Sequence, residues 1–156
     1  MATDFFKSIP HTFTEAEKAL IQKAIDFATT AHKDQKRRSG EPFVTHPMSA
    51  AIILGQIFPD ATAITATILH DITEDTDTTD TNLKEEFSEE IAALVDGVTK
   101  LGHVRLRNST DEYYVENLRK MFIATSKDIR VMLIKLADRL HNMRTIGALS
   151  PEKQTK

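Results

Sequence analysis

Residues 68–76 read "ILHDITEDT", a stretch that joins the end of an apolar run to a cluster of polar side chains. The apolar residues that lead into it recur at helical spacing. His70 and Asp71 stand side by side, and Glu74 and Asp75 follow three residues later. Residues four apart share one face of a helix, so we expect His70 to lie beside Glu74. The same spacing places Asp71 beside Asp75. One helix end would thus present an imidazole and three carboxylates.

Helical spacing of apolar residues continues outward through most of the chain, and strand patterns are nearly absent. Thr14, Ser88 and Asp128 are suited to be N-caps. "KDQKRRSGEPF" is expected to be a basic loop and "TDTTDT" a turn-rich linker. Helices are predicted over residues 14 to about 35, 47–58, 62–75, 83–87, 88–101, 111–125 and from 128 through "IRVMLIKLADRLHNMRTI". The sequence therefore predicts an all-α domain of about seven helices.

Composition restricts the class of protein. The chain has 156 residues, 40% of them hydrophobic, which is enough for one domain with its own core. It has no cysteine, which excludes disulfides and thiolate chemistry and fits a reducing compartment such as the cytoplasm. No secretory signal is seen, and the most apolar region, residues 47–69, is interrupted by Pro59, so we expect no membrane span. The net charge of −3 argues against a broad basic face for nucleic acid, but a local basic cluster could hold a small anion.

Four side chains from separate segments form a candidate metal site. His46 precedes Pro47, which favours the first turn of a helix, so His46 should stand where that helix starts. His70 and Asp71 end another helix, and Asp138 lies within the last apolar one. Two imidazoles and two carboxylates suit manganese, zinc or iron.

Such a metal can hold a phosphate oxygen and lower the pKa of a bound water molecule. Glu74 and Asp75 could then orient the water or move its proton. Asn142 and Thr145 share a helix face with Asp138, which extends the polar patch along the last helix.

Each of these residues also has a purely structural interpretation. The "HD" doublet alone is a weak signal, and the acidic run "EDTDTTD" could be a solvated loop. Asp138 could pair with Arg139 or Lys135 on a helix surface, and His46 could simply hydrogen-bond where its helix starts. His32 and His141 are interpreted as packing or supporting groups. We favour the metal site because separated segments supply the required residue types together.

Five segments in order resemble the hydrolase domain of the RelA/SpoT-type alarmone enzymes, which belong to the HD-domain metal-dependent phosphohydrolases. The resemblance covers about residues 13–156 and is carried by "AHKDQKRRSGEPFVTHP", "ATILHDITEDT", "LVDGVTKL", "ENLRKMF" and "DIRVMLIKLADRLHNMRT". It implies an all-α fold, a manganese ion and a role in degrading the alarmone of the stringent response. The implied reaction removes the 3′-pyrophosphate of guanosine tetra- or pentaphosphate, giving GDP or GTP plus pyrophosphate.

The resemblance also implies roles for individual residues. The implied metal ligands are His46, His70, Asp71 and Asp138. The implied catalytic acids are Glu74 and Asp75. The implied nucleotide-binding residues are Arg37, Arg38 and Ser39 in the basic loop, with Asn142 and Thr145 beside the guanine and ribose.

Three departures from the family pattern bear on these expectations. Phe43 stands where many relatives carry tyrosine, and Thr73 where they usually carry valine or isoleucine. The chain ends at "LSPEKQTK", so we expect a single hydrolase domain over residues 1–156 that lacks C-terminal helices and a synthetase domain. Two alternatives stay open: another HD-type nucleotide phosphohydrolase, and a regulatory module that binds the alarmone without turnover.

Overall fold

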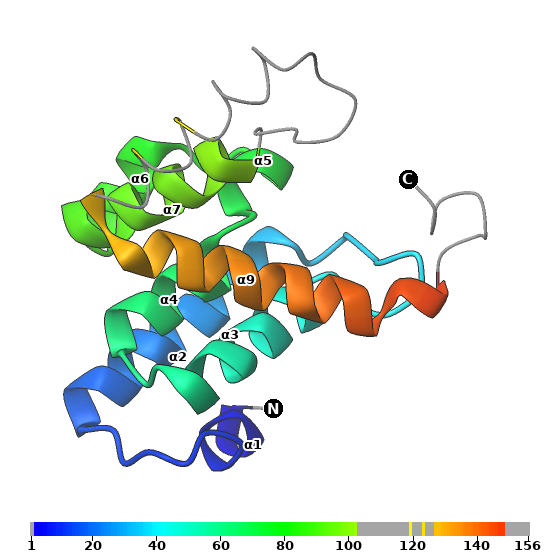
Figure 1. Ribbon diagram of the computed structural model, residues 1–156, viewed down its shortest axis with the longest axis horizontal. Helices are drawn as coiled ribbons and strands as arrows, with labels where there is room; N and C mark the ends of the chain where they lie inside the picture. Colours follow the sequence, from blue (N-terminus) through cyan, green and yellow to red (C-terminus); the bar gives the residue numbers. More distant parts are fainter. Residues whose placement is uncertain (1, 103–118, 120–122, 124–126, 149–156) are drawn as a thin grey trace.

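A computed structural model describes residues 2–102, 119, 123 and 127–148 of the chain (Figure 1). In this part of the chain the regular structure is helical, apart from one isolated bridge between Lys36 and Pro42. The elements in order are α1 Ala2–Lys7, α2 Glu15–Ala31, α3 Thr45–Ile57, α4 Ala61–Leu69, α5 Ile72–Asp75, α6 Asp80–Glu86, α7 Glu89–Gly102, α9 Ile129–Arg144 and the 3₁₀ turn η1 Ile146–Ala148. The prediction of an all-α domain is confirmed.

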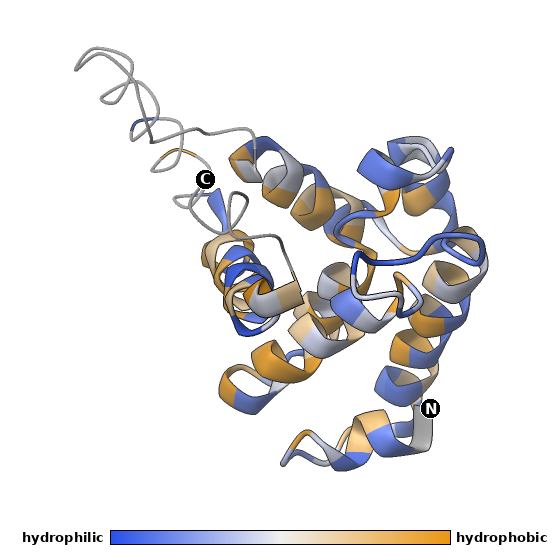
Figure 2. Ribbon diagram, turned by 90° about the vertical axis from the view of Figure 1, so that its right-hand side faces the viewer, coloured by the Kyte–Doolittle hydropathy of each residue, from blue (hydrophilic) through white to orange (hydrophobic). Residues whose placement is uncertain are grey.

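Helix α4 forms the centre of the molecule. All but one of its residues are buried, which agrees with a helix that is apolar on every side. It packs against α2, α3, α7 and α9, and α9 crosses in front of α3 and α4 in Figure 1. In Figure 2 the hydrophobic residues lie mainly along the helix sides that face one another, whereas the loop at the front is hydrophilic. Among the described residues, no helix is both long and apolar enough to cross a membrane.

The predicted helix caps are present. The side chain of Thr14 accepts the main-chain N–H of Glu17, whose carboxylate accepts in return, so α2 begins with a capping box. Ser88 accepts the N–H of Ile91, and Asp128 caps α9 by accepting the N–H of Arg130.

Two expected segments differ from the structure. The prediction that "TDTTDT" is a linker is wrong in part. Thr79 and Asn82 form a second capping box, and α6 begins at Asp80, three residues before the predicted start. Helix α3 begins at Thr45, so His46 lies inside its first turn and not before it. Of the predicted helix over residues 111–125, the structure describes only residues 119 and 123, both as helical, and the rest lies outside the described residues.

The prediction of one continuous helix over residues 62–75 is wrong. Helix α4 ends at Leu69, and the short helix α5 begins at Ile72. The carbonyl oxygen of Thr67 would accept the N–H of Asp71 in a continuous helix, but it accepts Nδ1–H of His70 at 2.7 Å instead. The chain therefore turns at His70 and Asp71, and the polar side chains on the two sides of the turn do not share one helix face.

A close contact between α7 and α9 sets the position of the last helix. A Cβ atom added to Gly97 would lie 2.8 Å from Cγ2 of Val131, which is closer than packed atoms approach. Glycine at this position lets α9 pack directly on the backbone of α7. The contact matters for the site, because α9 carries Asp138.

Candidate active site

His70 is held with one ring nitrogen bonded to the backbone and the other facing a pair of carboxylates. It is buried, and its Nδ1 donates to the carbonyl oxygen of Thr67. Nε2 therefore carries the lone pair of a neutral ring. This nitrogen lies 3.0 Å from Oδ1 of Asp71 and has no hydrogen-bond partner among the described residues. A buried ring nitrogen without a partner, beside carboxylates, suits a metal ligand.

The other three predicted ligands converge on the same point from different elements. Nε2 of His46, on α3, lies 3.3 Å from Oδ1 of Asp138 on α9 and 3.6 Å from Oδ2 of Asp71. Nε2 of His70 lies 3.8 Å from Oδ1 of Asp138. One ligand atom from each of His46, His70 and Asp138 lies within 4.8 Å of the others. The structure thus brings together all four residues that the sequence proposed as ligands.

The charges of this cluster fit a cation. Burial lowers the pKa of His70, but the negative charges of Asp71 and Asp138 outweigh it and raise the pKa to about 10. Burial raises the pKa of Asp138, but the neighbouring imidazoles and Lys135 hold it below its usual range. The two carboxylates therefore favour a positive charge at this point, which a bound cation could supply. The donor set of imidazole nitrogen and carboxylate oxygen suits a borderline divalent ion.

Asp138 has further partners on its own helix. Nδ2 of Asn142 donates to its Oδ1 at 2.6 Å, and Nζ of Lys135 pairs with its Oδ2 at 3.0 Å. Of the structural interpretation, the pair with Lys135 is present, but Asp138 is buried and does not lie on a helix surface. The same carboxylate also faces both histidines.

A cavity of about 600 Å³ opens beside the cluster, and its volume is in the range of small-molecule sites. Every nucleotide-binding residue that the resemblance implied lines this cavity. Four cationic side chains contribute to its wall, so it suits an anionic ligand although the whole chain is acidic. The lining consists of Lys36, Arg37, Arg38, Ser39, Phe43, His46, Asp71, Asp138, Arg139, Asn142, Thr145 and Ala148.

The basic loop is shaped by a tight turn. Gly40 has a φ of 89°, a conformation that glycine adopts without strain. Its N–H donates to the carbonyl of Arg37, and the N–H of Arg37 donates to the carbonyl of Glu41. These bonds fix the backbone of Arg37, while Arg38 and Ser39 at the tip are exposed.

The predicted catalytic acids lie next to the cluster but outside the cavity. Glu74 and Asp75 are on α5, one turn after Asp71, and both are exposed. Burial and the negative charge of Asp71 raise the pKa of Asp75, in the direction that favours proton transfer near neutral pH. Their catalytic role stays a prediction.

Two supporting residues were not assigned a specific contact from the sequence. Nδ1 of His141 lies 2.7 Å from Nδ1 of His46, so its interpretation as a supporting group agrees with the structure. Gln35 accepts from the buried His32 and donates to the main-chain oxygen of Asp75. No sequence signal beyond the spacing of polar residues marks these contacts, because they join segments far apart in the chain.

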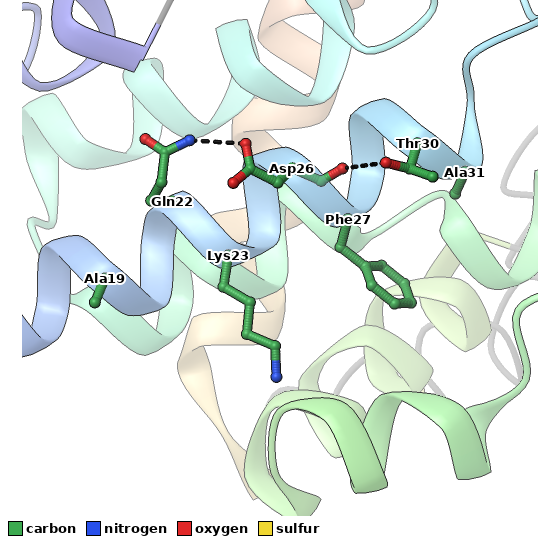
Figure 3. Close-up of a pocket in the computed structure, with 7 residues that line it drawn as sticks. All are labelled: Ala19, Gln22, Lys23, Asp26, Phe27, Thr30 and Ala31. Atoms are coloured by element: carbon green, nitrogen blue, oxygen red, sulfur yellow. Dashed lines mark hydrogen bonds between the residues drawn. The ribbon is translucent and has the colours of Figure 1, made fainter.

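A second hollow, of about 680 Å³, lies on the outer face of α2 (Figure 3). The exposed surface of its lining is mostly apolar, and among the described residues Lys23 and Asp26 are the charged ones. The carboxylate of Asp26 accepts a hydrogen bond from Gln22, as Figure 3 shows. The described residues of this lining include no imidazole and no pair of carboxylates, so the cavity beside His46 is the candidate active site.

Comparison with known proteins identifies the family. A model of the HD domain matches residues 24–156. The chain belongs to the HD-domain family. This family implies a divalent metal, and the group of His46, His70 and Asp138 in this HD domain could bind one.

Relatives of this HD domain confirm the resemblance to RelA/SpoT-type enzymes. A probable guanosine-3′,5′-bis(diphosphate) 3′-pyrophosphohydrolase of Synechocystis sp. is 50% identical over 143 residues, which are 92% of this chain and 19% of the relative. A protein of Haemophilus influenzae named guanosine-3′,5′-bis(diphosphate) 3′-pyrophosphohydrolase is 51% identical over 129 residues, 83% of this chain and 19% of the relative. The chain therefore spans about a fifth of the length of these relatives. A solved structure of a metazoan ortholog of SpoT, described as hydrolysing ppGpp, superposes with a TM-score of 0.69 and 25% identity, covering 93% of this chain and 81% of that one.

Proposed function

We propose that this HD domain hydrolyses guanosine 3′,5′-bis(diphosphate), or the corresponding pentaphosphate, at the 3′ position and releases pyrophosphate. The observation that carries the proposal is the convergence of the Nε2 atoms of His46 and His70 with the carboxylates of Asp71 and Asp138 at the wall of a cationic cavity. The relatives named as pyrophosphohydrolases support the choice of substrate.

In this proposal, His46, His70, Asp71 and Asp138 hold one divalent ion, and manganese is the ion that we propose. When bound, the ion would neutralise phosphate oxygens and lower the pKa of a water molecule. Zinc or iron would fit the same donors, because imidazole and carboxylate do not distinguish strongly among them.

The protein side chains perform the remaining tasks. Arg37, Arg38 and Ser39 bind the phosphates or the base, since a guanidinium plane suits both. Asn142 and Thr145 contact the guanine and ribose side of the nucleotide. These residues line one cavity, which supports a single bound nucleotide.

Glu74 and Asp75 are proposed to orient the attacking water and to move its proton. Water adds across the phosphorus–oxygen bond, so that a hydroxyl goes to phosphorus and a proton to the 3′ oxygen of the ribose. The raised pKa of Asp75 supports a role in that proton transfer.

The family match over residues 24–156 supports the further proposal that these residues form one HD-type domain. A cytoplasmic location, where guanine nucleotides are abundant, belongs to the same proposal.

A second candidate function is nucleotide binding without turnover. The position of Glu74 and Asp75 outside the lining of the cavity favours it, because a catalytic pair must reach the scissile bond. Another HD-type nucleotide phosphohydrolase is a third candidate, and a panel of nucleoside mono- and triphosphates separates it from the first.

The deciding experiment measures pyrophosphate released from guanosine tetraphosphate, with manganese and with a chelator. Manganese-dependent release of GDP and pyrophosphate in equal amounts is the expected result. A nucleotide that binds in the presence of manganese but stays intact would reject hydrolysis and support the binding module.

A further inference from the structure

A chain of hydrogen bonds runs from the basic loop to His46. Nδ1 of His141 lies 2.7 Å from Nδ1 of His46 and 3.2 Å from Nη1 of Arg37. The rings of His46 and His141 lie nearly side by side, with centroids 4.9 Å apart. The proposed function uses Arg37 only for the nucleotide and gives His141 no role, so these contacts call for a separate explanation.

The direction of each bond follows from the chemistry of the donors. Only one hydrogen fits between two ring nitrogens at this distance. A guanidinium has donors only, so its contact with Nδ1 of His141 favours a lone pair on that nitrogen over an N–H. A ring nitrogen has one lone pair, so Arg37 and His46 donate to the same lone pair in a three-centre arrangement. The hydrogen between the rings therefore belongs to Nδ1 of His46. Because a neutral imidazole has one N–H and one lone pair, Nε2 of His46 is left with the lone pair that faces Asp138.

His70 reaches the same tautomer by a simpler route. Its Nδ1 donates to the main-chain oxygen of Thr67, which can only accept. For His46 the acceptor is another histidine, whose ring nitrogen can either donate or accept. Arg37 is the group that decides between the two, because it can only donate.

The same guanidinium also sets the orientation of an amide. Nη2 of Arg37 donates to Oδ1 of Asn142 at 3.3 Å, and Nδ2 of Asn142 donates to Oδ1 of Asp138 at 2.6 Å. Since Arg37 requires the amide oxygen on its own side, the NH₂ group is directed at Asp138. One side chain thus orients the partners of two predicted metal ligands.

We propose that Arg37 is a positioning residue of the metal centre, which acts through His141 to keep the Nε2 lone pair of His46 available for the metal. The inference rests on the proposed metal centre and adds a role for Arg37 that is separate from its predicted contact with the nucleotide. Partners that orient metal-binding histidines typically change metal affinity by about 10- to 100-fold when removed.

Charge alone predicts the opposite effect, which makes the inference testable. Removing a positive charge near a cation site strengthens cation binding. Arg37→Ala should therefore bind manganese more tightly if the guanidinium acts only by its charge, and more weakly if it holds the tautomer. Arg38→Ala is the matched control, because Arg38 is the adjacent arginine of the same loop and is exposed.

The experiment measures manganese affinity by titration calorimetry on the full chain, after removal of bound metal, without nucleotide. We expect Arg37→Ala and His141→Ala to weaken binding by about 10- to 100-fold, and Arg38→Ala to leave it unchanged or slightly tighter. His141→Asn should recover part of the loss, since its Oδ1 lies near the place of Nδ1 and can accept from His46. Cobalt absorption spectra should change in Arg37→Ala and not in Arg38→Ala.

Each other outcome has a defined meaning. Unchanged or tighter binding in Arg37→Ala, or equal weakening in both arginine variants, would overturn the inference while leaving the metal centre intact. Absence of manganese and cobalt binding in the wild type would instead contradict the metal centre of the proposed function. Melting temperatures of the metal-free variants identify any that fails to fold, in which case the comparison of His141→Ala with His141→Asn decides.

Discussion

His70 shows how a single side chain both ends a helix and prepares a ligand. Its Nδ1 takes the carbonyl oxygen that the next turn of α4 would have used, so the helix stops and Asp71 turns toward the cluster. The same bond leaves Nε2 buried, with no hydrogen-bond partner in the part of the chain that the structure describes. One hydrogen bond thus both ends the helix and orients the ring nitrogen that the sequence suggested as a metal ligand.

Glu74→Gln tests the proposed acid–base pair at this scale. The substitution keeps the size of the side chain and removes its capacity to move a proton. We expect unchanged manganese affinity and a turnover slower by about two to four orders of magnitude, measured as pyrophosphate release. Glu85→Gln, on the exposed side of α6, serves as the control. A turnover within a few-fold of the wild type would reduce Glu74 to a structural residue.

At the scale of the element, two of the contacts between α9 and α7 help to position α9. Arg130 pairs with the capping residue Asp128 at 2.6 Å and with Glu90 on α7 at 2.7 Å. Gly97 then allows the helix to lie directly against the backbone of α7. These contacts place Asp138 and Asn142 against the histidines. Substitutions at the contact between α7 and α9, far from the cavity, should therefore alter metal binding at the site.

The cap of α9 should make stability depend on pH. The hydrogen bond from Arg130 lowers the pKa of Asp128, so the folded state binds this proton less readily than the unfolded state. The stabilisation is complete above about pH 4 and is lost as the pH falls through the lower, folded-state pKa. Urea unfolding of the wild type and Asp128→Asn should show a difference in free energy that shrinks from about pH 5 to about pH 3. The carboxylates of the metal cluster are present in both proteins, so their contributions to the pH dependence largely cancel. A difference in the free energy of unfolding that stays constant with pH would contradict the prediction.

Gly97→Ala tests the contact between the two helices. Alanine favours a helix over glycine by roughly 0.5–1 kcal/mol, but the clash with Val131 should cost about 1–3 kcal/mol. We expect a net loss of stability in urea unfolding and weaker manganese binding, because α9 must move. Gly147→Ala, where an added Cβ meets no atom within 4 Å, is the control. A stabilised Gly97→Ala with unchanged metal affinity would show that α9 does not depend on this contact.

For the whole molecule, the candidate site joins α3, the turn after α4, and α9. Its ligands come from segments that are distant in the sequence and meet only in the folded chain. A metal that binds the folded state and not the unfolded one should therefore stabilise the entire domain.

Metal removal should lower the melting temperature. At a free manganese concentration about 100 times the dissociation constant, the stabilisation is about 2.7 kcal/mol, which corresponds to roughly 5–10 °C for a domain of this size. Asp71→Ala should abolish or strongly reduce the difference in melting temperature between protein with manganese and protein with chelator. Asp26→Ala, on the outer face of α2, should keep it. A full shift retained in Asp71→Ala would remove Asp71 from the ligand set.

Much of this architecture could be predicted without coordinates. Apolar spacing predicted most of the helices on the described residues but not α1 or the break between α4 and α5, and Thr14, Ser88 and Asp128 were correctly expected as caps. These features depend on neighbours within a few residues, so local sequence is sufficient to determine them. The residue types of the candidate site, two imidazoles and two carboxylates, were likewise evident.

Only the tertiary structure decided how those residues face one another. The break at His70, the donor–acceptor order from Arg37 through His141 to His46, and the cavity shared by the basic loop and α9 all depend on contacts between distant segments. Helical periodicity reports the face of one helix and contains no information on how three elements cross. The sequence by itself determined most of the helices and the chemical groups they carry, because these depend on near neighbours in the chain, while packing around α4 decided which atoms meet.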